Sequence, residues 1–192
     1  MAILTALFDA CVLFPPSLRD LLMQLTLTGL FQARWTEEIN DEWIESALKT
    51  PTPGTTRDKL ERTRRLMSVV SMEKNCLVTD YLDLIPSLQM PDPNDRHVLA
   101  AAIRSHSDVI VTKNLKHFPS DVLKGYGIMA EHPDTFLTRI INLNPGVVCV
   151  TVKMCRERKR NPPKTVEQYL ADLENTELPK TVVLLRQFAN LI

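Results

Sequence analysis

Three carboxylates lie in separate segments of this 192-residue sequence, at positions where a fold could bring them together. Asp9 ends the apolar segment 3–8. Glu42 lies in a segment with helical periodicity, and Asp95 stands shortly before the apolar run 98–103. Acids that crowd into one cleft repel one another, and a hard divalent cation with carboxylate and water ligands relieves this repulsion. We therefore predict a Mg²⁺ or Mn²⁺ site formed by Asp9, Glu42 and Asp95.

A cation held in this way has a defined chemistry. It can orient a water molecule, lower the pKa of that water for attack on phosphorus, and stabilise the charge that develops on the phosphoryl oxygens. The reaction that this chemistry implies is the hydrolysis of a phosphodiester.

Each acid also has a purely structural interpretation. Asp9 could simply end a strand, although a charge beside an apolar segment is costly to bury without a partner, which favours a functional role. Glu42 has several acidic neighbours on its helix, and most acids on a helix are solvated. Asp95 could be a helix cap, a role that is compatible with binding a cation.

The elements that carry these acids are predicted to form a parallel sheet. Residues 3–8 are predicted as a central strand, and residues 109–111 as a short strand buried on both faces. The helix that begins near Asp95 leads into the second of these strands, which ends at Thr112. Because open parallel sheets bind their ligands at the carboxyl ends of the strands, Asp9, Asp95 and Thr112 are expected to share one edge.

Further helices and strands complete an α/β pattern. Ser17 is predicted to cap a helix that extends to Leu30, and Thr36 to begin the helix that carries Glu42. Thr56 begins a mostly solvated helix. Other predicted elements are one or two short strands in 75–85, an edge strand in 125–130 and a helix over 133–143. Strands that alternate with helices predict a three-layer α/β/α fold with a central parallel sheet.

The chain is predicted to contain two parts. An α/β domain spans residues 1–130, and a small helical C-terminal extension spans residues 131–192. The extension contains a basic run over residues 153–164, followed by helix-like segments over 166–173 and 181–191.

The charge, the cysteines and the amino-terminal segment indicate where the protein is expected to be, but they do not indicate its function. Lys and Arg together number 23, as do Asp and Glu, so the net charge argues neither for nor against a nucleic-acid partner. The four cysteines lack metal-ligand spacing and are predicted to be reduced thiols of a cytoplasmic protein. The apolar amino-terminal segment contains Asp9 and has no basic residues before it, so neither a signal peptide nor a membrane helix is expected.

Four separated motifs together resemble the PIN domain, the fold of the VapC-type toxin ribonucleases. They are Phe-Asp-Ala-Cys-Val-Leu at residues 8–13, the segment 36–42, Pro-Asp-Pro-Asn-Asp-Arg-His-Val-Leu-Ala-Ala-Ala at residues 91–102 and Val-Thr-Lys-Asn-Leu-Lys-His-Phe-Pro at residues 111–119. The resemblance covers residues 1–130, and the tail resembles the helical extension found in a subset of these proteins. It implies a metal-dependent endoribonuclease that is the toxin of a type II toxin–antitoxin pair.

The resemblance assigns roles to individual residues. The family's first three acids fall on Asp9, Glu42 and Asp95, and its hydroxyl residue falls on Thr112. These four residues, together with Asn114, are the expected catalytic residues.

The family's fourth acid is replaced in this sequence. It commonly lies two or five residues after the hydroxyl residue, where this chain has Asn114 and His117. Asn114 offers a carbonyl oxygen to a metal-bound water but adds no negative charge. We therefore expect a weaker or single metal site, in which Asp92 could substitute for the missing acid.

An acidic site repels an RNA backbone, so local positive charge is expected to hold the substrate. Lys113 and Lys116 follow the last core strand, and Arg158, Lys159 and Arg160 belong to the basic run. These five residues are the predicted RNA contacts. The basic run could equally be a solvated helix without such a role.

The resemblance also implies two protein partners, an antitoxin segment laid into the active-site groove and a second copy of the chain. The first predicted helices carry more leucines than one face of a small sheet can cover, among them Leu22, Leu25 and Leu30. Some of these leucines are therefore expected at an interface.

Two other functions stay open at this point. A PIN fold that binds RNA or a protein but has lost efficient cleavage is favoured by Asn114 and His117. An aspartyl phosphatase with Asp9 as nucleophile is disfavoured, because Cys11 stands where such enzymes use a second Asp.

Overall fold

The protein is represented by a computed structural model that describes residues 3–52 and 54–192. Four parallel strands form its sheet in the order β2-β1-β3-β4. They are β1 (Thr5–Phe8), β2 (Gln32–Arg34), β3 (Val109–Val111) and β4 (Met129–Glu131). The predicted α/β fold with a central parallel sheet is therefore confirmed.

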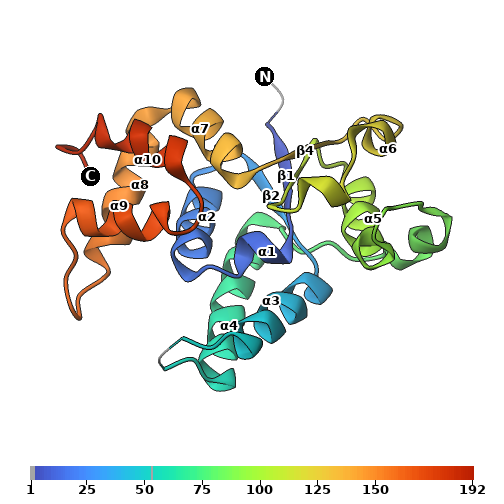
Figure 1. Ribbon diagram of the computed structural model, residues 1–192, viewed down its shortest axis with the longest axis horizontal. Coiled ribbons are helices and arrows are strands. Elements are labelled where there is room, and N and C mark those ends of the chain that lie inside the picture. The colour runs from blue at the N-terminus through green and yellow to red at the C-terminus, as the bar shows by residue number, and fades with distance from the viewer. Residues whose placement is uncertain (1–2, 53) are drawn as a thin grey trace.

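Helices cover both faces of this sheet. Figure 1 shows α2 (Pro16–Thr28) and α7 (Pro133–Leu143) on one side and α5 (Arg96–Arg104) on the other. The other α-helices are α1 (Ala10–Leu13), α3 (Glu37–Lys49), α4 (Arg57–Lys74), α6 (Ser120–Lys124), α8 (Pro145–Glu157), α9 (Val166–Glu174) and α10 (Pro179–Arg186). Short 3₁₀ helices are η1 (Leu82–Ser87), η2 (Pro93–Asp95) and η3 (Leu115–His117). Within the described ranges no single helix is long and apolar enough to cross a membrane; α7 and α8 meet that criterion only as a pair, which bends by 119°.

The strands β1 and β3 are the two central strands of the sheet, and every side chain on them is buried. Phe8, at the end of β1, packs edge-on against Phe31 and Phe136, with ring centroids 5.9 Å away in both cases. Phe136 belongs to α7, so the first helix after residue 130 packs on the core of the sheet. α8 and α9 contact α2, and α10 contacts α7. The helices of the extension therefore continue the core of the α/β domain.

The strand prediction for residues 75–85 is wrong. Leu77 forms only an isolated parallel bridge with Trp35, and the chain then turns into η1. The apolar residues in this segment do not share a face: Leu82 is 63% exposed, whereas Leu84 and Ile85 are packed against the core. A short apolar run predicts burial better than it predicts a strand.

Two of the three residues predicted to cap the start of a helix, Thr36 and Thr56, do so in the structure. Thr36 and Thr56 each accept a hydrogen bond from the backbone N–H three residues later, at 3.0 and 3.3 Å. Ser17 is not a cap, because α2 already begins at Pro16, whose fixed φ suits the first position of a helix.

Leu22 and Leu25 are fully buried within the chain, so neither of these two leucines is available to an interface with another chain. One face of the sheet alone would not cover all the leucines of α2. In the structure α2 also contacts α4, α8 and α9, which provide the missing cover. Leu30 is partly buried against the same core.

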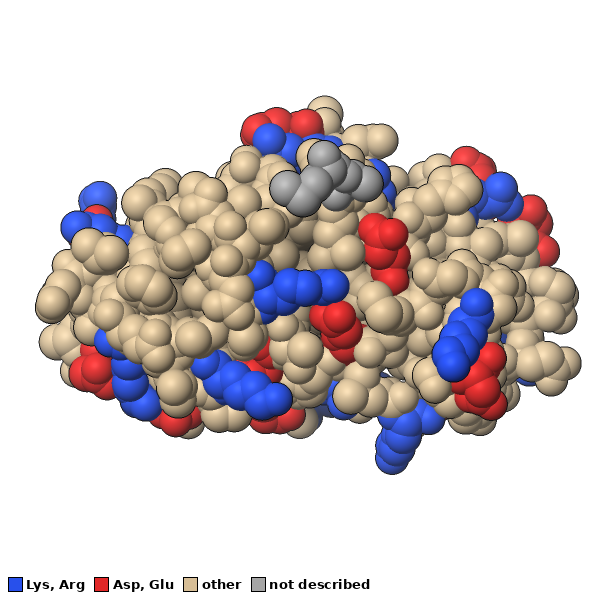
Figure 2. Space-filling view, turned by 90° about the horizontal axis from the view of Figure 1, so that it is seen from above, with Lys and Arg blue, Asp and Glu red and all other residues tan. Residues whose placement is uncertain are grey.

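The face seen from above Figure 1 is drawn in Figure 2. Its acidic and basic side chains lie in small mixed groups on a largely uncharged surface. This agrees with the equal numbers of acidic and basic residues in the sequence. This face should therefore attract a charged ligand only weakly. Binding of such a ligand must depend on individual charged side chains elsewhere on the molecule.

Candidate active site

A groove of about 1030 Å³ opens at the carboxyl ends of the central strands. Its lining includes Asp9 after β1, Glu42 on α3 and Asp95 before α5. Lys113 and Asn114, which follow β3, belong to the same lining. The structure thus brings into one groove four of the five residues that were predicted to be catalytic.

Asp9 is oriented by the fifth predicted residue, Thr112. Thr112 Oγ1 donates a hydrogen bond to Asp9 Oδ2 at 2.6 Å, and Cys11 Sγ donates to the same oxygen at 3.1 Å. Thr112 is fully buried and accepts a hydrogen bond from the backbone N–H of Asn114 at 3.0 Å. Within the described residues Asp9 Oδ1 has no hydrogen-bond partner, so this oxygen is available to a cation.

Cys11 is a neutral donor in this arrangement. Burial, and then the nearby charge of Asp9, raises the pKa of its thiol to about 12. The thiol therefore keeps its proton at neutral pH and can donate it to Asp9. All four cysteines are free thiols in the structure, as the sequence predicts.

Glu42 reaches the groove because α3 is fixed at its start and along its buried face. Thr36 caps the helix, and Trp43, next to Glu42, is fully buried. Glu42 Oε1 lies 3.1 Å from Nε2 of His97, a residue of α5 that is 4% exposed. Burial alone would lower the pKa of His97, but the hydrogen bond and the charge of Glu42 outweigh it and raise this pKa. The pair therefore ties α3 to α5 at the groove.

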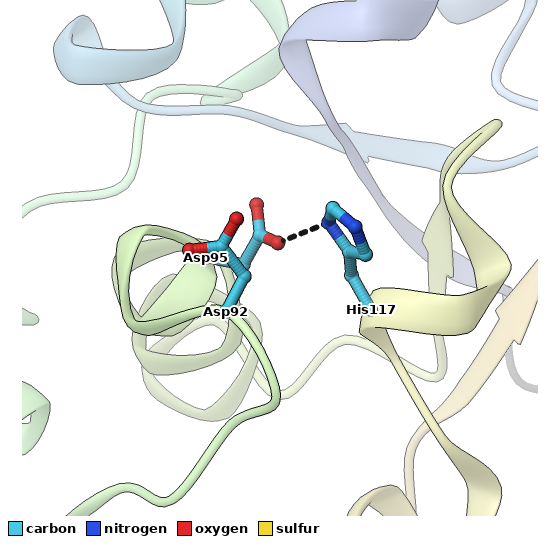
Figure 3. A group of neighbouring side chains, drawn as sticks. All are labelled: Asp92, Asp95 and His117. Carbon is cyan, nitrogen blue, oxygen red and sulfur yellow. Dashed lines mark hydrogen bonds and ion pairs between the residues drawn. The ribbon is translucent and has the colours of Figure 1, made fainter.

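Asp95 belongs to a group of ligand-type side chains that Figure 3 shows. Its Oδ2 lies 2.8 Å from Nδ1 of His117 on η3. One ligand atom from each of Asp92, Asp95 and His117 lies within 4.8 Å of the other two. Burial raises the pKa of Asp95; the hydrogen bond from His117 opposes this shift, and the charges of Asp9 and Asp92 add to it.

Asp92, rather than Asp95, supplies the cap at the start of this segment. The Asp92 side chain accepts a hydrogen bond from the backbone N–H of Asn94 at 2.9 Å. Asp95 makes no capping hydrogen bond to α5. The carboxylate of Asp95 is therefore engaged with His117 and the groove.

Comparison with known protein families agrees with this geometry. The family model described as "PIN domain" matches residues 5–116, more than half of the chain, and the match includes Asp9, Glu42 and Asp95. The chain belongs to the PIN domain family. The resemblance seen in the four sequence motifs is thereby confirmed. A second family model, described as "VapC50 C-terminal domain", matches residues 133–187 of this PIN protein.

A curated relative of this PIN protein is described as "Putative ribonuclease VapC50" and comes from Mycobacterium tuberculosis strain H37Rv. The two sequences are 43% identical over 90 residues, which is 47% of this chain and 53% of the relative. The matched part of the chain thus spans about half the length of that relative. No solved structure matches this PIN protein.

The groove of this PIN protein contains carboxylates of the type that hold a hard divalent cation, but among the described residues the ligand atoms that lie within 4.8 Å of one another belong to Asp92, Asp95 and His117. Asp9, Glu42 and Asp95 supply the carboxylate oxygens that such a cation prefers. Burial is the main cause of the raised pKa of Asp95, and repulsion by the charges of Asp9 and Asp92 adds to it. A cation among these carboxylates would offset that repulsion.

The basic run lies away from this groove. Arg158 and Lys159 each lie 2.8 Å from a carboxylate oxygen of Asp20 on α2. Arg160 is exposed beyond the end of α8. The described lining of the groove contains none of these three basic residues.

Lys113 forms an ion pair with Glu177, an acid outside the predicted site residues. Glu177, between α9 and α10, lies 3.0 Å from Lys113 Nζ and lines the groove together with Asn175 and Thr176. Lys116 is exposed on η3, outside this lining. The sequence carries no local signal for Glu177, which lies outside the four PIN motifs and reaches the groove only through the tertiary fold.

Proposed function

We propose that this PIN protein is a metal-dependent endoribonuclease that hydrolyses phosphodiester bonds of RNA, and that it is the toxin of a type II toxin–antitoxin pair. The observation that carries this proposal is the convergence of Asp9, Glu42 and Asp95, from three separate segments, on one groove. Membership of the PIN family and the relative described as a ribonuclease support it.

Asp9, Glu42 and Asp95 would together hold Mg²⁺ or Mn²⁺ in the groove. The bound cation supplies activation of the attacking water and stabilisation of charge on the phosphoryl oxygens. Thr112 keeps Asp9 in one orientation through its short hydrogen bond, and His97 does the same for Glu42. Residues that do not touch the substrate thus fix the positions of those that do.

Two further residues of the groove act on the substrate in this proposal. Lys113 donates hydrogen bonds to phosphate oxygens and offsets part of the negative charge of the site. The side-chain carbonyl of Asn114 accepts a hydrogen bond from the attacking water and orients it.

A second candidate function is an RNA-binding PIN fold with weak turnover. It is favoured by Asn114 and His117, which occupy the positions where the family commonly has an acid. His117 bonds to Asp95 in this structure, and an imidazole, unlike a carboxylate, adds no negative charge to the site. In this case RNA binding persists while cleavage is slow at every concentration of Mg²⁺ or Mn²⁺.

Cleavage of a labelled RNA, with EDTA and after adding back Mn²⁺, tests the proposal. The native protein should cleave only with the cation, and Asp9→Asn should reduce the rate on the order of 100-fold or more, because it removes a charged ligand. The matched control is Asp83→Asn, which changes an exposed acid away from the groove. Cleavage that resists EDTA, or an Asp9→Asn variant as active as Asp83→Asn, would contradict the proposal.

We further propose a cognate antitoxin and a second copy of the chain as protein partners, and the cytoplasm as the place where the protein acts on RNA. The family resemblance is the support for all three. Light scattering at micromolar concentration should give the mass of two chains. A monomer at every concentration would contradict the homodimer.

A further inference from the structure

The loop between α9 and α10 forms one wall of the catalytic groove. Asn175, Thr176 and Glu177 belong to the lining that also contains Asp9 and Asp95. These loop residues come from the C-terminal extension, whereas the predicted cation ligands all come from the α/β domain. The extension therefore has access to whatever enters the groove.

Glu177 forms an ion pair with Lys113, the lysine that follows β3. Its Oε1 lies 3.0 Å from Nζ of Lys113, and its Oε2 lies 3.8 Å from Nε2 of His132. The Lys113 side chain is only 16% exposed, whereas Glu177 is 66% exposed. The hydrogen bond from Lys113 is the main cause of a lowered pKa for Glu177, so this carboxylate is charged at neutral pH.

The position of this loop is fixed by its neighbours. Leu178 is fully buried, and the buried carboxylate of Asp134 accepts hydrogen bonds from the backbone N–H groups of Lys180 and Thr181 at 3.0 and 2.8 Å. Glu177 itself has φ +68°, a left-handed conformation that is uncommon for a residue other than Gly, Asn or Asp. Burial and hydrogen bonds of the residues that follow Glu177 therefore fix its position at the groove despite an unfavourable backbone conformation.

The ion pair between Lys113 and Glu177 matters for a phosphate ligand because the groove has few basic residues to bind it. Lys113 and Lys49 are the Lys and Arg residues of the described lining. The acids of the same lining are Asp9, Glu38, Asp41, Glu42, Glu45, Asp95 and Glu177. A phosphate that approaches the carboxyl end of β3 must therefore compete with Glu177 for Lys113.

We propose that Glu177 lowers RNA affinity because its carboxylate and an RNA phosphate compete for the same ammonium group, that of Lys113. We call this competing ion pair between Glu177 and Lys113 the latch. The inference rests on the proposed function for the identity of the ligand. Lys113 is released to the substrate when the phosphate displaces Glu177, so the extension sets the affinity of the groove without taking part in the chemistry.

Glu177→Gln tests the latch, since it keeps the size of the side chain and removes its charge. Steady-state cleavage of a labelled RNA with Mn²⁺ at low salt should show KM lowered about two- to fivefold, the range of an exposed ion pair, with kcat unchanged. The difference should fade at high salt. Glu174→Gln is the matched control, because Glu174 forms an exposed ion pair with Arg186 outside the groove lining. Unchanged or higher KM in Glu177→Gln would overturn the latch.

A double-mutant cycle separates the latch from general repulsion by one more acid. In a Lys113→Gln background, Glu177→Gln should have little effect on KM, because the residue with which Glu177 competes for substrate is gone. An equal effect in both backgrounds would overturn the proposal. Glu177→Asn, which suits a positive φ, provides a second charge-removing variant should Gln disturb the loop.

Anisotropy of a fluorescent RNA in EDTA keeps this test independent of cleavage. Tighter RNA binding by Glu177→Gln than by the native protein is expected, and equal affinities would overturn the latch. A native protein that binds RNA but does not cleave it with Mn²⁺ would contradict the endoribonuclease proposal and leave the comparison of affinities valid.

Discussion

Asp9 is oriented by donors from two different segments. Thr112 follows β3 and Cys11 lies in α1, and both donate to Asp9 Oδ2. The carboxylate therefore has one orientation before any ligand arrives. A side chain that is already fixed loses less conformational entropy on binding, so this arrangement favours the capture of a cation by the other oxygen.

The cysteines of the native protein are expected to resist alkylation at pH 8. With a pKa of about 12 for Cys11, about one thiol in 10,000 is ionised at pH 8, and the thiolate is the reactive form. Burial also raises the pKa values of Cys76, Cys149 and Cys155. Mass spectrometry after brief iodoacetamide treatment should show no adduct on the native protein and four on the chain unfolded in guanidinium. Rapid modification of native Cys11 would contradict its role as a neutral donor.

Asn114→Asp is expected to tighten Mn²⁺ binding, because it adds a negative charge where the PIN family commonly has an acid. Calorimetry measures the affinity. Asn175→Asp is the matched control, since it adds the same charge to the groove lining at a position outside the PIN motifs. No gain at position 114, or an equal gain in both variants, would show that the charge at 114 is not close to the cation, and Asp92 would be the next residue to change.

The sequence identified some groove residues for physical reasons and others only through the family resemblance. Asp9 and Asp95 stand at the end of a strand and at the start of a helix, positions that a parallel sheet brings to one edge. Glu42 needed the motif, because periodicity does not distinguish it from the other acids on its helix. His97 lies in the third motif, yet its pairing with Glu42 depends on the tertiary fold, which brings one residue of α5 close to one of α3. Glu177 depends on the fold of the whole extension.

Among the elements, α3 has the most direct effect on the site, because it carries Glu42. Thr36→Ala removes the capping hydrogen bond of α3 and should lower the free energy of unfolding by about 1–2 kcal/mol. Urea denaturation followed by circular dichroism measures this change. Thr56→Ala, which removes the cap of the solvated helix α4, should cost less because Thr56 is exposed and Thr36 is buried. An equal or larger loss for Thr56→Ala would contradict this account of α3.

Elements with a uniform local signal were predicted, and elements that depend on a distant partner were not. β1 and β3 are continuous apolar segments, and α7 begins and ends where the sequence indicates. β2 has polar residues at both ends and is a strand only because it pairs with β1, Thr5 with Gln32 and Leu7 with Arg34. The strand prediction for residues 75–85 was wrong for the opposite reason. The apolar residues of this segment are typical of a strand, but the segment pairs with its neighbour at one isolated bridge only.

The whole molecule has a net charge of zero, so it does not attract RNA from a distance. Individual Lys and Arg side chains near the groove must therefore bind the RNA backbone. Lys113→Gln should reduce the salt slope of RNA binding by about 0.7, the value of one phosphate contact to a single strand. Changing Arg158, Lys159 and Arg160 together to Gln should alter the slope less, because Asp20 already offsets the first two. Fluorescence anisotropy at several salt concentrations measures both slopes. A larger loss of slope in the triple variant would assign the main RNA contacts to the basic run.

Asp9, Glu42 and Asp95, which come from separate parts of the chain, are proposed to form one cation site at the edge of the sheet. Calorimetric titration with Mn²⁺ of the native protein, of Asp95→Asn and of the exposed control Asp83→Asn tests it most directly, with circular dichroism to verify the fold of each. The native protein and Asp83→Asn should bind Mn²⁺ alike, and Asp95→Asn should bind it roughly tenfold or more weakly, because a charged oxygen ligand is lost. A folded Asp95→Asn variant with native Mn²⁺ affinity would contradict the claim.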